Sequence, residues 1–304
     1  ASGIPANLGG VIWNSSGQSS SPLALWRVVD ESDPTVSATS ELNFTLKNGP
    51  VYYYVNDVYT PDDVYCEAAG SSANTGASPL SPKRHVSEIL AAYDLEPGDV
   101  VYVDTGLYQL TAPVTVGDLD AGGISQNPAM QVRFLGSTNE FAGGTRFIVS
   151  DPEVAAFQMD KTYGIRLSRM NISGATSGIA VADSYYIGGD WLNVRDCHDG
   201  VSISGISSNI GLTHSTLVAN RNAGILFSAG EMGTMDVGSS VLWSNRFGIR
   251  LDTGYVRSSN SIFGIVKPQS FGIYVMAGVP LTGFIGDYNN LYVGQPDSAV
   301  GGLQ

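Results

Sequence analysis

The sequence has few charged residues, and those it has are mostly acidic. Charged residues make up 14% of its 304 residues, and 15 lysines and arginines stand against 28 aspartates and glutamates, a net charge of −13. No run of basic residues is present to contact phosphates, so we expect no nucleic-acid partner. No stretch of about 18 apolar residues occurs, so we also expect no insertion into a membrane.

Cysteine and histidine are scarce as well. Two cysteines, Cys66 and Cys197, cannot form a disulfide framework, and with three histidines they show none of the spacings of a zinc site. The sequence favours free thiols, although a fold that brought the two cysteines together would allow one bridge. The motifs G-x-S-x-G, P-loop and H-E-x-x-H are all missing. A function must therefore be sought in the repeat pattern and in polar clusters.

Glycine and aliphatic residues, in contrast, are abundant. Hydrophobic residues make up 43% of the chain, which is enough for a sizeable core, and the 37 glycines follow no G-X-Y period, which excludes collagen. Glycines scattered among valine, isoleucine, serine and threonine predict many short strands joined by tight turns.

A glycine followed by alternating aliphatic residues recurs at intervals of 22 to 24 residues. The copies are GIAV at Gly178, GVSI at Gly200, GILF at Gly224, GIRL at Gly248 and GIYV at Gly272. This period is too long for a hairpin and suits a rung of three short strands and three turns. We therefore predict an all-β solenoid, a single-stranded parallel β-helix. Its interior should stack the residues that follow the glycines, namely Ile179, Val201, Ile225, Ile249 and Ile273.

One segment before the rungs predicts an α-helix. Ser81 followed by Pro82 suits an N-cap and a first helical position. Apolar residues then recur at helical spacing from Val86 to Tyr93, before Pro97 and Gly98 end the pattern. A helix here would cover the apolar end and the open strand edges of the first rung.

The stretch from Tyr53 to Tyr108 resembles the opening segment of right-handed parallel β-helix proteins of the pectate lyase (pectin lyase-like) superfamily. The matching residues are a YV strand, the loop GSSANTG, a proline ahead of the helix, and GDVVYVDTGLY. The resemblance implies a right-handed β-helix with an N-terminal capping α-helix. It is weak for function, because the superfamily includes lyases, hydrolases, epimerases, tailspikes and adhesins. Ser72 stands where acidic residues often occur in lyase-like members, which speaks against a cation site in that loop.

These patterns divide the chain into three parts. Residues 1–50 predict a β segment or the remnant of a preceding module, residues 51–98 an initial strand, a loop and the capping helix, and residues 99–304 the rungs. The last rung has no capping helix, so we expect the chain to be part of a longer multidomain protein.

Catalytic chemistry has one candidate cluster. In lyases of the superfamily, carboxylates hold Ca²⁺ and a lysine or arginine abstracts a proton, so Ca²⁺ is the cofactor to consider, although no metal ligands can be named. Outward positions of the regular rungs are mostly small and neutral, and Asp160 and Asp252 would be about 19 Å apart. The turn Asn193 to Gly200 is denser in polar groups. The predicted catalytic residues are Asp196, His198, Asp199, Arg221, Arg250 and Asp252. The alternative is a solvated turn with aspartate–arginine pairs, and His214 is expected to pack in or beside a strand.

Aromatic residues on successive rungs are candidates for sugar contacts. The predicted substrate-binding residues are Tyr185, Tyr186, Trp191, Tyr255 and Tyr274. Sugar rings pack on exposed aromatic faces. The alternative is stacking within the core, which is favoured for Trp191 and Trp243.

Two hypotheses for function follow. In the first, the protein is secreted and directed at a polysaccharide or cell-surface glycan, which it binds or cleaves as a lyase or glycoside hydrolase. In the second, it is a non-catalytic structural or adhesive module of a larger cell-surface protein. Both place it outside the cell or on its surface.

Overall fold

The chain divides into two units, Ala1–Val51 and Tyr52–Gln304. A computed structural model describes residues 3–5, 12–295, 297 and 299–303. Each unit is described by itself. In the described part of the chain, no helix has the length and apolar character that a membrane crossing needs.

The first unit consists of two small antiparallel sheets. One pairs β1 (Ser21–Ala24) with β4 (Phe44–Leu46), and the other pairs β2 (Arg27–Val29) with β3 (Ser37–Thr39). The ring of Trp26 contacts those of Trp13 and Phe44, with centroids 4.9 and 5.2 Å away. The strands are those of a β segment, while its origin as the remnant of a preceding module stays a prediction.

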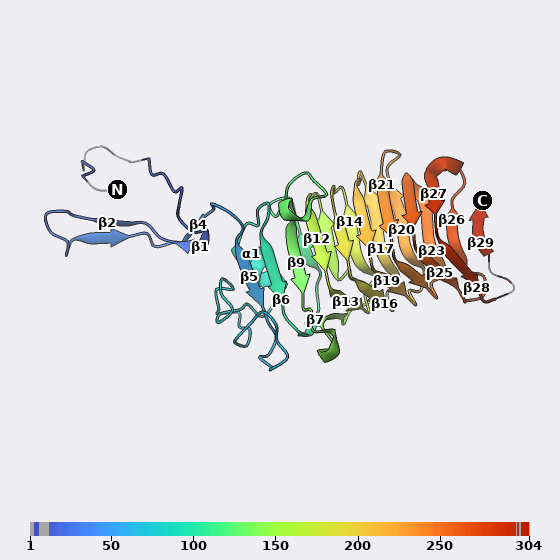
Figure 1. The fold of residues 1–304 in the computed structure, drawn as a ribbon, viewed down its shortest axis with the longest axis horizontal. Helices are drawn as coiled ribbons and strands as arrows, with labels where there is room; N and C mark the ends of the chain where they lie inside the picture. The colour runs from blue at the N-terminus through green and yellow to red at the C-terminus, as the bar shows by residue number, and fades with distance from the viewer. Residues whose placement is uncertain (1–2, 6–11, 296, 298, 304) are drawn as a thin grey trace. The chain divides into compact units, whose positions relative to one another are not determined.

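The second unit is a parallel β-helix whose strands follow one another around three sheets (Figure 1). Sheet 1 contains β5 (Tyr52–Val55), β6 (Val100–Val103), β9 (Val132–Gly136), β12 (Ile165–Ser168), β15 (Gly188–Asp190), β18 (Ile210–Thr213), β21 (Thr234–Gly238), β24 (Tyr255–Ser259) and β27 (Phe284–Asp287). Sheet 2 contains β7 (Gly106–Leu110), β10 (Thr145–Val149), β13 (Met170–Ser173), β16 (Asn193–Arg195), β19 (Thr216–Val218), β22 (Val241–Trp243), β25 (Ile262–Ile265) and β28 (Asn290–Val293). Sheet 3 contains β8 (Val114–Val116), β11 (Phe157–Asp160), β14 (Ser177–Ala182), β17 (Asp199–Gly205), β20 (Ala223–Ala229), β23 (Phe247–Thr253), β26 (Phe271–Val275) and β29 (Ala299–Leu303).

The interior column predicted from the repeat is confirmed. Ile179, Val201, Ile225, Ile249 and Ile273 are paired in register along sheet 3. The first four are buried, and Ile273 is partly exposed. The period therefore reports one turn of the solenoid, and each turn adds aliphatic residues to a continuous core.

The recurring glycines are required by the close approach of neighbouring rungs. A Cβ atom added to Gly200 would lie 2.5 Å from the carbonyl oxygen of Gly224, and one added to Gly224 would lie 2.8 Å from that of Gly248. The sequence indicated tight turns, but these glycines lie at the starts of strands and do not have positive φ. Because these glycines have no side chain, the backbone of the next rung can pack directly against them.

Each corner between sheets contains a buried ladder of polar side chains. The ladders are Ser215, Ser240 and Ser261 between sheets 1 and 2, Asn220 and Asn245 between sheets 2 and 3, and Ser184 and Ser207 between sheets 3 and 1. In each ladder a side-chain oxygen accepts a backbone N–H of the preceding rung. These bonds satisfy backbone N–H groups at the corners, where the chain bends and the hydrogen bonds of the sheets are interrupted. Asn220 and Asn245 thus cap the backbone N–H groups of Cys197 and Asn220.

The capping helix α1 (Val86–Ala92) begins later than the sequence predicted. The predicted start at Ser81 and Pro82 is wrong, because the backbone of Lys83 pairs with Tyr54 and Asn56 beside β5. The helix begins after His85, and Glu88 accepts hydrogen bonds from the N–H groups of Arg84 and His85. Val86 and Ile89 are buried, and the helix lies against β8. The described residues also include the short 3-10 turns η2 (Pro128–Met130), η3 (Glu140–Ala142) and η4 (Leu281–Gly283).

Candidate functional site

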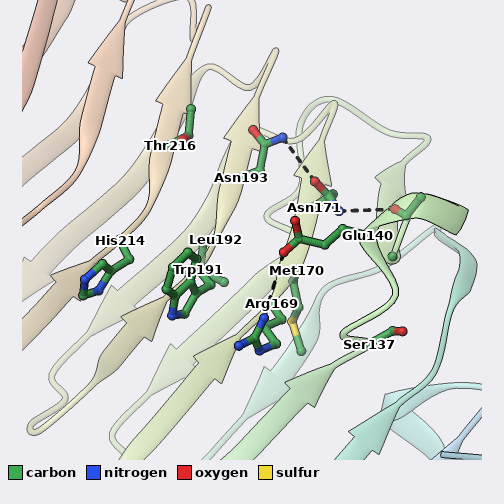
Figure 2. Close-up of a pocket in the computed structure, with 12 residues that line it drawn as sticks. Ser137, Glu140, Arg169, Met170, Asn171, Trp191, Leu192, Asn193, His214 and Thr216 are labelled. Carbon is green, nitrogen blue, oxygen red and sulfur yellow. Dashed lines mark hydrogen bonds and ion pairs between the residues drawn. The ribbon is translucent and has the colours of Figure 1, made fainter. Parts of the chain in front are cut away.

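Two adjoining hollows mark the outer face of sheet 2. They have volumes of about 350 and about 380 Å³. They share Gly143, Asn171, Asn193 and Thr216, so they form one continuous depression that we call the sheet 2 groove. The residues that matter for its chemistry are Glu140, Arg146, Arg169, Trp191, Arg195 and His214. The turn η3 supplies Glu140, and Figure 2 shows it beside the strands that carry the two asparagines.

Three side chains from successive corners form a stack at one edge of the groove. The rings of Trp191 and His214 are nearly parallel, with centroids 5.0 Å apart and 11° between planes. The guanidinium carbon of Arg169 lies 5.6 Å from the centre of the Trp191 ring. Figure 2 shows Trp191 between the other two. Cation–π and ring contacts hold the three together, and half of the Trp191 surface stays exposed at 50%.

The backbone at these three corners is left-handed, although none of them is glycine. The φ angles are 56° at Arg169, 55° at Trp191 and 49° at His214. A residue with a Cβ atom loses about 1 kcal/mol in this conformation. The equivalent corners of the next two rungs carry Ser239 and Asn260, which are small. The strain at these corners motivates the hypothesis that the three large side chains have a function.

Polar groups line the floor of the groove. Asn193 Nδ2 donates to Asn171 Oδ1 over 3.1 Å, which fixes both amides. Asn193 Oδ1 is buried and has no hydrogen-bond partner in the structure. A buried acceptor without a donor is costly, so a hydroxyl group of a ligand or a water molecule would be bound there.

The groove is locally basic in a chain of net charge −13. It has three arginines, and two of them have only long contacts with carboxylates: Arg169 Nη1 is 4.0 Å from Glu140 Oε1, and Arg195 Nη1 is 3.6 Å from Asp196 Oδ2. Exposed pairs of this kind contribute little to stability. The guanidinium groups can therefore turn to carboxylate or hydroxyl groups of a ligand.

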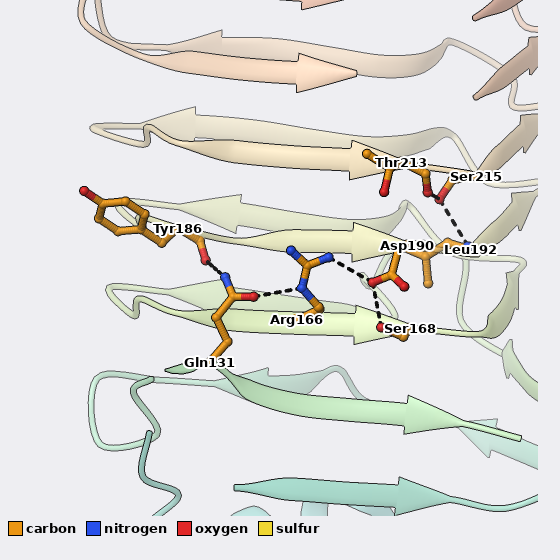
Figure 3. Close-up of polar contacts among 8 residues, drawn as sticks. All are labelled: Gln131, Arg166, Ser168, Tyr186, Asp190, Leu192, Thr213 and Ser215. Atoms are coloured by element: carbon orange, nitrogen blue, oxygen red, sulfur yellow. Dashed lines mark hydrogen bonds and ion pairs between the residues drawn. The ribbon is translucent and has the colours of Figure 1, made fainter. Parts of the chain in front are cut away.

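Of the predicted substrate-binding residues, Trp191 lines the groove and the others lie elsewhere. Tyr185 and Tyr186 are at the corner between sheets 3 and 1, and the carbonyl of Tyr186 accepts a hydrogen bond from Gln131 (Figure 3). Tyr255 is on β24 of sheet 1. Tyr274 is on β26 of sheet 3, where its ring packs 4.9 Å from that of Phe247. The structure therefore does not bring these aromatic residues together.

The predicted catalytic residues lie on a corner and on sheet 3, and they do not line the groove, although Asp196 contacts Arg195, which does. His198 Nε2 is 4.0 Å from Asp199 Oδ2, so these two are brought together. The other oxygen of Asp199 accepts the backbone N–H of Ala223 and the amide of Asn222, which joins one rung to the next. Asp196 and Arg221 are exposed at the same corner.

Arg250 and Asp252 form their own ion pair of 2.9 Å on β23. The hydrogen bond that Arg250 Nε donates to Asp252 Oδ1 raises the pKa of Arg250. The six predicted catalytic residues thus form two groups: four lie at one corner, and Arg250 and Asp252 form a separate pair. Their catalytic role stays a prediction.

A second polar network, not predicted from sequence, covers part of sheet 1 (Figure 3). Arg166 bonds Asp190 Oδ1 through Nη1 and Gln131 Oε1 through Nε, at 2.9 and 2.8 Å. The guanidinium lies across Gly188, where a Cβ atom would be 2.8 Å away from it. Ser168 donates to the same aspartate oxygen. Because the charged groups are paired with one another, we interpret this network as a clamp on the loop before β9.

The groove residues missed at the sequence level carry a weak but real pattern. Arg169, Trp191 and His214 are separated by steps of 22 and 23 residues, and Asn171 and Asn193 by 22. Extending the repeat one rung toward the N-terminus would have aligned them. The glycine signature that revealed the later rungs begins only at Gly178. His214 was expected to pack in or beside a strand, and it instead lies exposed at a corner.

The groove does not fit a calcium ion. Ca²⁺ takes six to eight oxygen ligands, several of them carboxylates, whereas Glu140 is the one carboxylate among the described residues that line the hollows. Over the described residues as a whole, no group of three or more His, Cys, Asp or Glu could hold a metal.

Comparison with known proteins identifies the fold. No family model matches the chain, and no curated protein matches it. A structure of a rhamnogalacturonan lyase is similar, with a TM-score of 0.53 and 15% identity over 82% of this chain and 62% of that one. The structure of jun a 1, the major allergen from cedar pollen, has a TM-score of 0.52 and 10% identity over 78% of this chain and 66% of that one. The chain spans less than two thirds of the length of each. The fold is that of a pectate lyase-like right-handed parallel β-helix, as the sequence predicted.

Proposed function

We propose that the protein binds an acidic polysaccharide in the sheet 2 groove. The observation that carries this proposal is the stack of Arg169, Trp191 and His214 beside the arginine-lined floor. The stack combines aromatic surface with N–H donors, which suits a ligand that has both apolar ring faces and hydroxyl or carboxylate groups. A glycan target agrees with the name of the similar lyase, and the proposal includes a location outside the cell or at its surface.

The groove accounts for selectivity toward acidic sugars. Its arginines supply positive charge that neutral sugars cannot use, while the overall negative charge of the chain repels acidic polymers elsewhere on the surface. The hydrogen bond between Asn193 and Asn171 fixes both amides at the floor of the groove. Residues of four successive strands, β10, β13, β16 and β19, line the depression, so we expect it to admit an internal part of a polymer.

Binding without cleavage is the form of the proposal that the geometry supports best. The lining has a single carboxylate, so a pair of acids for glycoside hydrolysis is not assembled there. Nor do the lining residues fit the calcium that the superfamily's lyases use. An adhesive or anchoring module of a longer surface protein would use the groove in this way, without a chemical step.

The test is a panel of polysaccharides assayed for binding and for cleavage. Polygalacturonate, rhamnogalacturonan and alginate would be compared with neutral galactan by affinity electrophoresis at low and high salt. Reducing ends and the absorbance of unsaturated products would be followed with and without a chelator. We expect salt-sensitive binding to acidic polymers and no product. Cleavage would contradict the binding-only form, and failure to bind any polymer would contradict the proposal altogether.

The matched variants are Trp191→Gly and Tyr255→Ala. Glycine relaxes the left-handed corner, so Trp191→Gly should unfold at the same urea concentration as the wild type or a higher one. It should nevertheless bind acidic polymer at least tenfold more weakly. Tyr255 is exposed on sheet 1, outside the groove, and its alanine variant should bind as the wild type does. If the wild type and both variants bound the polymer equally, Trp191 would not be part of the binding site.

A further inference from the structure

A second aromatic feature lies farther along the same face of sheet 2. The outward column that begins in the groove at Ser173 continues in register through Arg195, Val218, Trp243, Gly264 and Tyr292. Ser173, Arg195 and Val218 line the second hollow. Trp243 is therefore the next side chain that a ligand leaving the groove along this column would meet.

Trp243 and Tyr292 are stacked although a whole rung separates them. Their ring centroids are 5.6 Å apart with 15° between planes, whereas positions two rungs apart are separated by about 10 Å along the axis. The two rings must therefore lean toward each other over the strand between them. Tyr292 is 53% exposed, so the pair is accessible from solvent.

Gly264 makes this arrangement possible. A Cβ atom there would lie 1.9 Å from Cε3 of Trp243, inside the indole ring. A glycine within a strand weakens it and often marks a close approach. Here the approaching group is the ring of Trp243 on the outer surface, where it does not contribute to the packing of the core.

Resting on the proposed function, we propose that Trp243 and Tyr292 form a second contact site for the same acidic polysaccharide. The polymer lies along the solenoid axis, with its charged groups at the arginines of the groove and a later sugar against the aromatic pair. From β10 to β28 there are six rung spacings, about 29 Å. The surface from the groove to the aromatic pair is therefore long enough for several sugar units of an extended chain.

The proposal predicts that affinity depends on chain length. Oligogalacturonides of three and eight units would be titrated by calorimetry into the wild type and the variants Gly264→Ala, Trp243→Ala and Ile262→Ala. The octamer should bind the wild type at least tenfold more tightly than the trimer. Gly264→Ala and Trp243→Ala should lose this gain and still bind the trimer normally. Ile262 is exposed on β25, two residues before Gly264 and in the adjacent outward column, and its alanine variant serves as the control.

The outcomes separate the two proposals. If the wild type binds neither oligomer, the proposed function is contradicted. If it binds the trimer and gains nothing from the octamer, or if the gain survives in Trp243→Ala, the second contact site is contradicted and the groove is not. Gly264→Ala is interpreted only if its urea midpoint matches the wild type, and Trp243→Ala tests the proposal whether or not Gly264→Ala folds.

Discussion

Replacing Asn245 with alanine tests the idea that buried ladders hold the corners together. Its Oδ1 atom accepts the backbone N–H and the side-chain amide of Asn220, at 2.9 and 3.1 Å. Its Nδ2 atom donates to the carbonyl of Leu217 over 2.9 Å. Asn245 is 3% exposed and Asn220 is 0% exposed, so water does not replace these bonds without a rearrangement.

The expected loss follows from these bonds. Leaving the buried N–H of Asn220 without an acceptor costs about 1 to 3 kcal/mol, and each of the other two bonds contributes about 1 kcal/mol. Partial relaxation lowers the sum, and we expect the free energy of unfolding to fall by about 3 kcal/mol. The matched control is Asn290→Ala, in which the same atoms are removed from an exposed strand position. Its effect should stay within about 0.5 kcal/mol.

Urea unfolding followed by far-ultraviolet circular dichroism measures both variants. Because each rung of a solenoid contacts only its neighbours, hydrogen exchange should also show lost protection near Asn220 before distant rungs respond. A loss below about 1 kcal/mol for Asn245→Ala, or an equal loss for Asn290→Ala, would refute the reasoning that satisfied corner donors stabilise the helix.

Three further predictions concern the interior. Burial raises the pKa of Asp120 to about 6, so the free energy of unfolding should fall as the pH rises from about 4 to about 6. In urea unfolding at pH 7.5, Asp120→Asn should therefore be more stable than the wild type by up to about 2 kcal/mol. At pH 4 the two proteins should be equally stable. Gly200→Ala should lower the melting temperature, with a loss of about 1 to 3 kcal/mol, because its Cβ meets a backbone oxygen at 2.5 Å, whereas Gly211→Ala, with its nearest atom 3.7 Å away, should be tolerated. Cys66 and Cys197 are free and buried, and burial raises the pKa of each thiol, so both should react with a thiol reagent only after unfolding; fast reaction in the native protein would contradict this.

The solenoid could be predicted from sequence because the residues that its interior requires recur once in every turn. The column from Ile179 to Ile273 and the glycines beneath the next rung both repeat, since every rung repeats the same packing. The start of the capping helix could not be predicted in this way. Its true position depends on the pairing of Lys83 with β5, a contact that local propensity does not contain.

Of the residues that the sequence predicted for a site, Trp191 lines the candidate groove. Its partners Arg169 and His214 come from other rungs, and Glu140 comes from η3, an excursion between β9 and β10 that breaks the period. Sequence proximity instead favoured Asp196, His198 and Asp199, which are neighbours along the chain. In a solenoid, neighbours on the surface are separated by one full turn, so a local cluster is a poor guide to a shared surface.

The left-handed corners have a consequence for how related chains would diverge. Asparagine or glycine is the relaxed choice at Arg169, Trp191 and His214, and the interior does not depend on what stands there. If the groove binds a glycan as proposed, related chains without this binding should carry small residues at these three positions, while their aliphatic columns persist.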